Sequence, residues 1–194
     1  MQLRLLACAV VLAAASGFAP PLRAAAPRPR RLFAPAAVRA EPAGAVAASY
    51  DLALGSAAVA ALGAVTGALP VTGVFGVFAG FLAFQTTNLR FVFNDSTKTF
   101  DLVQSGGDDT GENFVVGGAN SWKYDTFVNW DFFPSPAFPI LVYFKETQTS
   151  DEKWDVGAGK LDESSTGQIH FFPAIANCAE LAAAFERNGC AKVE

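Results

Sequence analysis

Residues 52–89 read LALGSAAVAALGAVTGALPVTGVFGVFAGFLAFQTTNL and contain no charged side chain. As one continuous helix this stretch would be ~57 Å long, nearly twice the ~30 Å hydrocarbon core of a bilayer. Pro70 divides it into two apolar segments, each just long enough to cross a membrane. The pattern therefore predicts a transmembrane hairpin of two helices that turns at Leu69-Pro70-Val71.

Both segments of the predicted hairpin carry spaced glycines. Gly63 and Gly67 form a small-xxx-small pair in the first segment, and Gly76 and Gly80 form another in the second. Such pairs let helix backbones approach closely in lipid. We therefore expect these four glycines to pack helix against helix. The alternative is a buried helical hairpin of a soluble protein, which would need the residues that follow to cover it.

After residue 89 the chain alternates short apolar runs with turn residues, as antiparallel strands do. Strands are expected at 89–93, 99–104, 114–116, 124–133, 140–146 and 168–172. A helix is expected after Asn177, with Asn177 as N-cap, Glu180 at position N3 and Gly189 as the C′ residue. Strands followed by one helix resemble a small barrel of pleckstrin-homology type. The predicted fold class is thus α+β: a transmembrane hairpin, then a small antiparallel β barrel or sheet with a C-terminal helix.

The residues before the hairpin look like a two-part targeting leader. Arg4 precedes an apolar run that is too short to span a bilayer, and small residues follow the run, so residues 1–17 are predicted to be a signal peptide. Residues 18–40 contain five arginines and no acidic residue, and they resemble a chloroplast transit peptide. Phe18 at the junction is typical of the bipartite leaders of algae with secondary plastids. An ordinary secreted protein with a basic linker is the alternative.

Charge is distributed unevenly along the 194 residues. Residues 1–49 hold six arginines and one glutamate, whereas the whole chain has a net charge of −4, so the part after residue 49 is acidic. An acidic body repels phosphate, which excludes DNA and RNA as main ligands. Only 16% of residues are charged, against roughly 25% in a typical soluble protein. Arg90, directly after the hairpin, predicts by the positive-inside rule that residues 90–194 face the stroma of a plastid.

Three aromatic strings follow the hairpin: WKYDTFVNW at 122–130, FPILVYFKET at 138–147 and HFFP at 170–173. They resemble an uncharacterised family of cyanobacterial and plastid membrane proteins, a domain of unknown function, over roughly residues 52–192. The resemblance implies a plastid membrane protein with a helical hairpin and a small β domain. It implies no activity, so no catalytic residue is transferred to this chain.

Aromatic residues are also the candidate site. Strand alternation places Trp130 on one face of the expected strand and leaves Phe127 and Phe133 on the other. Together with Phe138, beside a proline, these two form a candidate surface for a protein partner. The single histidine, His170, is expected to face outward beside Gln168, with no nucleophile assigned to it.

These patterns predict a non-enzymatic protein of a plastid membrane, most simply the thylakoid. Its expected partners are the lipid bilayer and an unidentified membrane protein, in the assembly or maintenance of a photosynthetic complex. Neither a cofactor, a metal, a nucleic acid nor a small-molecule substrate is expected. The alternative function is a module that binds lipid headgroups, which requires a basic pocket near the bilayer. An enzyme of unknown class is the third possibility.

Overall fold

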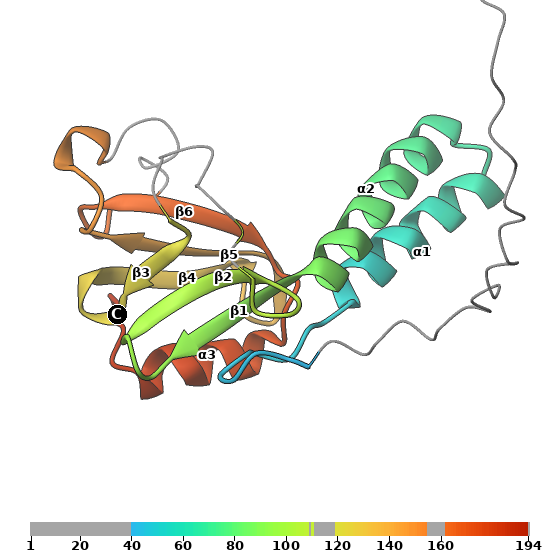
Figure 1. Cartoon of the computed structure of the whole chain (residues 1–194). Helices are drawn as coiled ribbons and strands as arrows, with labels where there is room; N and C mark the ends of the chain where they lie inside the picture. Colours follow the sequence, from blue (N-terminus) through green and yellow to red (C-terminus); the bar gives the residue numbers. More distant parts are fainter. Residues whose placement is uncertain (1–39, 109, 111–118, 155–161, 194) are drawn as a thin grey trace, which may run out of the picture. The chain divides into compact units, whose positions relative to one another are not determined.

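The computed structural model describes residues 40–108, 110, 119–154 and 162–193. Almost all of the predicted leader, at 1–17 and 18–40, therefore lies outside the described residues. Figure 1 shows an α+β fold. Its elements are α1 (Asp51–Val65), α2 (Leu69–Asn88), β1 (Leu89–Asn94), β2 (Thr99–Gln104), β3 (Ser121–Lys123), η1 (Tyr124–Thr126), β4 (Phe127–Ser135), β5 (Phe138–Glu146), η2 (Asp151–Lys153), β6 (Gln168–Pro173) and α3 (Cys178–Arg187).

The apolar stretch forms two helices that pack side by side, but the turn lies earlier than the sequence predicts. α1 ends at Val65, and Gly67 makes the reversal with φ +75°, a conformation that glycine adopts without strain. Pro70 lies in the first turn of α2 rather than in the loop. Its missing N–H costs nothing there, because the first N–H groups of a helix have no partner within the helix.

Only α2 is long enough to cross a membrane among the described residues. Its 20 residues extend ~30 Å, whereas the 15 residues of α1 extend ~22 Å, short of the hydrocarbon core. The prediction of two membrane-crossing helices is therefore not supported. What the structure has is one helix of spanning length with a shorter helix beside it.

The four glycines expected at the helix–helix contact have different surroundings. A Cβ atom on Gly63 would lie 2.9 Å from Thr72 Oγ1, so α1 and α2 approach closely at this point. Gly67 forms the turn. Gly76 and Gly80 do not lie at the contact with α1, since a Cβ on either would meet no atom within 4 Å.

The β domain consists of two three-stranded antiparallel sheets, in the orders β1-β2-β3 and β4-β5-β6. Of the two predicted alternatives, a small antiparallel barrel or sheet, the described residues form sheets that do not close into a barrel. The expected strand over 124–133 begins instead with the 3-10 turn η1, which separates β3 from β4. The short strand β3 was not predicted, and the strand expected at 114–116 lies outside the described residues.

A segment ahead of α1 belongs to the same unit. Val46 donates a backbone hydrogen bond to Phe91 O at 2.8 Å, and Gly44 O accepts one from Phe93 N at 3.0 Å, so the segment pairs with the edge of β1. Ala48 forms a further bridge with Ala176, just before α3. An edge strand left open would be a site of unwanted pairing, and this segment covers it.

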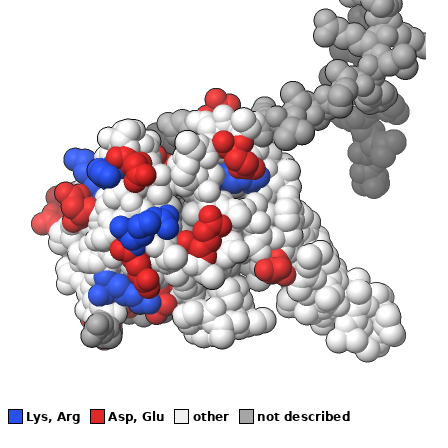
Figure 2. Space-filling model, turned by 90° about the horizontal axis from the view of Figure 1, so that it is seen from below, with Lys and Arg blue, Asp and Glu red and all other residues white. Residues whose placement is uncertain are grey.

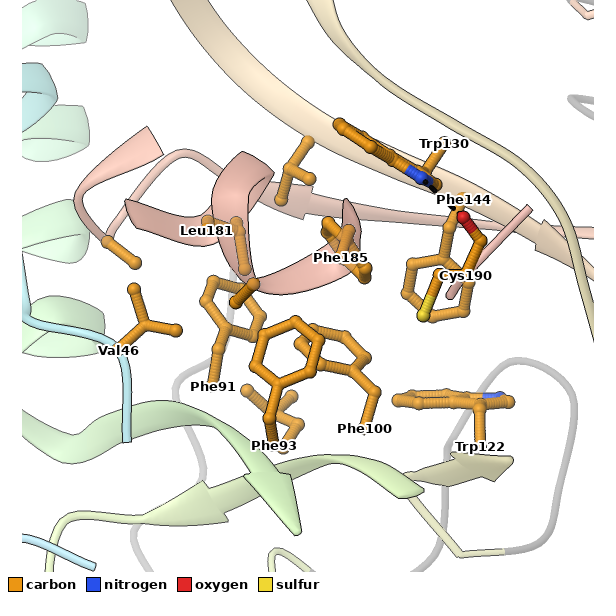
Figure 3. Packing of buried hydrophobic residues seen from close by; sticks show 14 of the residues in the cluster. Val46, Phe91, Phe93, Phe100, Trp122, Trp130, Phe144, Leu181, Phe185 and Cys190 are labelled. Atoms are coloured by element: carbon orange, nitrogen blue, oxygen red, sulfur yellow. Dashed lines mark hydrogen bonds between the residues drawn. The ribbon is translucent and has the colours of Figure 1, made fainter. Parts of the chain in front are cut away.

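Aromatic side chains from both sheets and from α3 form the core. Phe185 of α3 is fully buried and lies 5.0–5.2 Å, between ring centroids, from Phe93, Phe100 and Trp130 (Figure 3). Trp130 Nε1 donates to Cys190 O at 3.2 Å, which satisfies the one polar atom of its ring. The predicted cap of α3 is confirmed, because Asn177 Oδ1 accepts from Glu180 N at 3.1 Å.

Replacing Phe185 with alanine will destabilise the β domain by about 3–5 kcal/mol, because it removes a buried ring that contacts both sheets. Phe133→Ala is the matched control, since Phe133 is 58% exposed, and it will change stability by less than about 0.5 kcal/mol. The measurement is urea unfolding followed by tryptophan fluorescence. Equal midpoints for the two variants would contradict the assigned core.

Candidate functional site

The helical pair exposes apolar side chains along its length. The exposed large ones are Leu54, Val59, Leu62, Val65, Leu69, Val71, Val74, Val77, Phe78, Phe81 and Phe84. In Figure 2 acidic and basic side chains lie over the face of the β domain that carries α3, whereas the helical pair at the right is uncharged beyond Asp51. Contiguous exposed apolar surface of this extent marks contact with a membrane or a protein.

The turn between α1 and α2 satisfies its own backbone. The N–H groups of residues 66–69 all donate to carbonyl oxygens of the pair, at N···O distances of 2.8–3.3 Å. The Thr66 hydroxyl donates to Leu62 O at 2.9 Å. In hydrocarbon an unsatisfied backbone group costs several kcal/mol. A turn without charge and with its N–H groups paired is therefore suited to apolar surroundings.

Charge reappears where α2 passes into β1. Arg90 makes a two-pronged ion pair with Glu41, at 2.7 and 2.8 Å, and also donates to Thr86 O in the last turn of α2. A cation at this position interacts favourably with the helix C-terminus. The hydrogen bond from Arg90 lowers the pKa of Glu41. This ion pair fixes residue 41 beside the end of the apolar helix.

The structure separates the three phenylalanines of the candidate partner surface. Phe133 and Phe138 are 58% and 68% exposed. Phe127 is buried and stacks on Phe144 at 4.8 Å, so it is not available to a partner. The reason is an irregularity in register between Phe127 and Asn129, which breaks strict alternation and turns Phe127 to the same side as Trp130.

His170 points into the core, not outward as the alternation suggested. It pairs across the sheet with Phe144 and lies under the ring of Trp122, at 4.8 Å between centroids. Its Nε2 is 2.8 Å from Glu146 Oε1, and the Glu146 side chain is fully buried. Neither residue of this pair lines either of the two grooves described below. The arrangement is suited to stability rather than to contact with a substrate.

Hydrogen bonds hold Glu146 in its charged form. Burial alone would raise the pKa of Glu146, but bonds from His170 and from the hydroxyl and N–H of Thr149 outweigh burial and lower it. Thr149 Oγ1 donates at 2.6 Å and Thr149 N at 2.9 Å. Through its bonds to Thr149 and to His170, Glu146 links the turn after β5 to strand β6.

Lys145 faces the opposite side of the same sheet and is also fully buried. Its Nζ donates to Asp162 O at 2.5 Å and to Ser165 O at 2.6 Å. The Asp162 side chain accepts from Asn129 Nδ2 at 2.9 Å. These bonds attach the segment before β6 to the outer face of the sheet. The sequence does not indicate these partners, because the bonded residues lie 17 to 33 positions apart along the chain.

A shallow groove of about 500 Å³ lies at the β1–β2 turn and the end of α3. Lys98, Lys123, Tyr124 and Asp125 line it. Burial raises the pKa of Tyr124 to about 12, so the phenol stays protonated at neutral pH and is no general base. Among the described residues no three His, Cys, Asp or Glu side chains are grouped to hold a metal ion.

A family model described as "Protein of unknown function (DUF3119)" matches residues 45–189. The chain belongs to the DUF3119 family. No curated protein and no solved structure matches the chain. The DUF3119 match begins at Ala45, which pairs with β1, and ends at Gly189, which has φ +69° after α3. The family unit thus includes both the helical pair and the β domain.

The lowered pKa of Glu146 predicts an acid-sensitive fold. Stability from the ionised carboxylate is complete above its ordinary pKa of 4.5 and is lost as the pH falls through the lower folded-state value. Glu146→Gln will cost about 1–3 kcal/mol at pH 7, and its deficit will shrink below pH 4. The measurement is the melting temperature from pH 7 to pH 3, with the exposed Glu186→Gln as control. A deficit that is constant over this range would contradict the role of the charge.

Proposed function

We propose that the chain is a membrane-anchored, non-enzymatic protein whose α1–α2 pair inserts into a bilayer with its turn leading. The observation that carries this proposal is the exposed, uncharged, apolar surface of the pair. A core helix of a soluble protein buries such a surface, yet only 11% of the most apolar stretch of α2 is buried. Lipid can cover the apolar surface of the pair without removing any charged side chain from water.

The geometry of the pair supports insertion from one side. The start of α1 lies beside the end of α2, as the contact of Tyr50 with Thr87 shows (3.0 Å between hydroxyl oxygens), and α2 continues directly into β1 of the β domain. The Arg90–Glu41 ion pair lies at the same end. The turn at 66–68, at the other end, has no charge to hold it in water. Both ends of the pair and the β domain therefore lie on one side of the membrane.

We propose a plastid membrane, and within the plastid the thylakoid, as the place of action. The support is the basic, acid-free composition of residues 18–40 behind an apolar run, which resembles a transit peptide behind a signal peptide. Arg90 beside the membrane boundary favours a β domain in the stroma.

For the β domain we propose a membrane-protein partner, in the assembly or maintenance of a photosynthetic complex. The support is the pair of exposed phenylalanines, Phe133 and Phe138, at the β4–β5 hairpin. Aromatic side chains are enriched at the centres of protein interfaces. The hairpin approaches the helical pair, since Phe138 lines a groove with residues of α1 and α2. The partner surface is thus next to the membrane.

Headgroup binding at a basic pocket is the second candidate function. The groove with Lys98 and Lys123 favours it. β1 extends ~20 Å from the end of α2 to the turn that carries Lys98. This distance places the groove away from the bilayer in which the helical pair inserts, so we favour the partner surface.

Insertion predicts that a charge on α2 is costly only in lipid. Val77 is 76% exposed near the middle of α2, so Val77→Arg will leave the fold intact. At the bilayer centre an arginine costs about 2.5–3.5 kcal/mol, and the variant will float with phosphatidylcholine vesicles at least several-fold less than the parent chain. Val193→Arg, the same substitution outside the helices, is the control. Equal flotation of both variants would refute insertion.

The proposed partner surface predicts that co-purified subunits are lost when its two exposed phenylalanines are replaced. Phe133→Ser with Phe138→Ser will abolish co-purification of thylakoid complex subunits from gently solubilised plastid membranes, because the two exposed rings are removed. Mass spectrometry identifies the subunits. Val193→Ser, at another exposed position, is the control. A chain that purifies alone, or one whose partners survive the double substitution, would refute the surface.

A further inference from the structure

A groove of about 760 Å³ lies where the helical pair meets the β domain. Leu52, Gly55 and Val59 of α1 form one wall, and Phe75 and Phe78 of α2 form another. The β4–β5 turn and the start of α3 form the third. Sites for small molecules have volumes of roughly 300–1,000 Å³ and mostly apolar walls. This groove has both properties.

One end of the groove is polar. Ser49, Asp51 and Asn177 line it there. Ser49 Oγ donates to Asp51 Oδ2 at 2.8 Å, and residues 47–49 pair with 175–177 through the bonds Asn177 N to Ala47 O, 2.8 Å, and Ser49 N to Ile175 O, 2.9 Å. Of the described residues that line the groove, Asp51 is the only charged one. The polar end offers both hydrogen-bond donors and acceptors, with net negative charge.

The apolar part continues from this end along the helices. Asp51 and Val59 are eight residues apart on one face of α1, which is ~12 Å along the helix axis. Gly55 lies between them, and a Cβ atom on Gly55 would meet no atom within 4 Å. The absence of a side chain thus leaves the middle of the groove open. An elongated apolar chain with a polar group at one end fits this shape.

We propose that the groove binds one acyl chain of a membrane lipid, with its uncharged, hydroxyl-rich headgroup at the Asp51 end. Hydroxyl groups donate to the Asp51 carboxylate and accept from the side-chain NH2 group of Asn177, whose Oδ1 already accepts from Glu180 N. A phosphate headgroup is repelled by the like charge of Asp51, and none of the described residues that line the groove is basic and could offset this repulsion. The inference rests on the proposed membrane insertion, since the bilayer beside α1 and α2 supplies the lipid.

The test compares two lipids that share an acyl chain. The full chain in mixed detergent micelles is offered equal amounts of monoolein, with a glycerol headgroup, and oleoyl lysophosphatidate, with a phosphate headgroup. Native mass spectrometry then counts the lipids retained. We expect a one-to-one complex with monoolein that is at least ten-fold more abundant than that with lysophosphatidate. Equal retention of both, or retention of neither, would overturn the proposal.

Matched variants locate the site. Gly55→Leu places a side chain in the open part of the groove and will reduce the monoolein complex at least ten-fold. Gly73→Leu is the control, because Gly73 also has open space around it but does not line the groove. Asp51→Asn will raise the fraction of retained lipid that is lysophosphatidate, because it removes the negative charge that repels phosphate. A monoolein complex that persists in Gly55→Leu would overturn the assigned groove.

Vesicle flotation separates this inference from the proposed function. Gly55→Leu adds an apolar side chain to an apolar helix, so it will float as the parent chain does. If the parent chain floats but Gly55→Leu leaves the monoolein complex unchanged, the lipid groove is refuted and the membrane anchor is not. If the parent chain does not float, the membrane anchor is refuted. The groove inference then fails too, because no bilayer beside α1 and α2 would supply the lipid.

Discussion

An apolar surface that faces outward is the constraint on which the rest of the structure depends. Between Asp51 and Arg90 no side chain can form an ion pair, and the exposed residues of α1 and α2 are almost all apolar. Each 100 Å² of such surface costs about 2.5 kcal/mol in water. The local details agree with burial in lipid. The turn pairs its own N–H groups, and Arg90 is neutralised by Glu41 where charge returns.

The helical pair and the β domain share one core. α2 ends at Asn88 and β1 begins at Leu89, with no linker between them. Leu82 of α2 and Ala53 of α1 belong to the same buried cluster as Phe91 and Phe185. The two parts are therefore packed as one unit. This continuity also forms the groove at the junction, and the DUF3119 match spans both parts as one unit.

Local patterns in the sequence predicted local structure. The cap of α3 at Asn177 depends on contacts three residues apart, and the β1–β2 hairpin depends on short apolar runs around a turn, so both could be predicted. The inward direction of Phe127 depends on a bulge, and the burial of Glu146 depends on His170, 24 residues away. Single-sequence patterns do not show such pairings. A proline is as typical of the first turn of a helix, where Pro70 lies in α2, as of a loop, so the residue type alone does not distinguish the two places.

The buried Glu146 and Lys145 attach loops of the β domain to its second sheet, and the proposed function rests instead on the exposed apolar surface of α1 and α2. The most direct test of membrane insertion is spin labelling of single cysteines at Val74, Val77, Phe81 and Phe84 in vesicles. Insertion predicts that molecular oxygen, which concentrates in lipid, relaxes these labels more than a water-soluble nickel chelate does, whereas a label at Thr97 shows the reverse. High accessibility of all four helix positions to the nickel chelate would contradict the account.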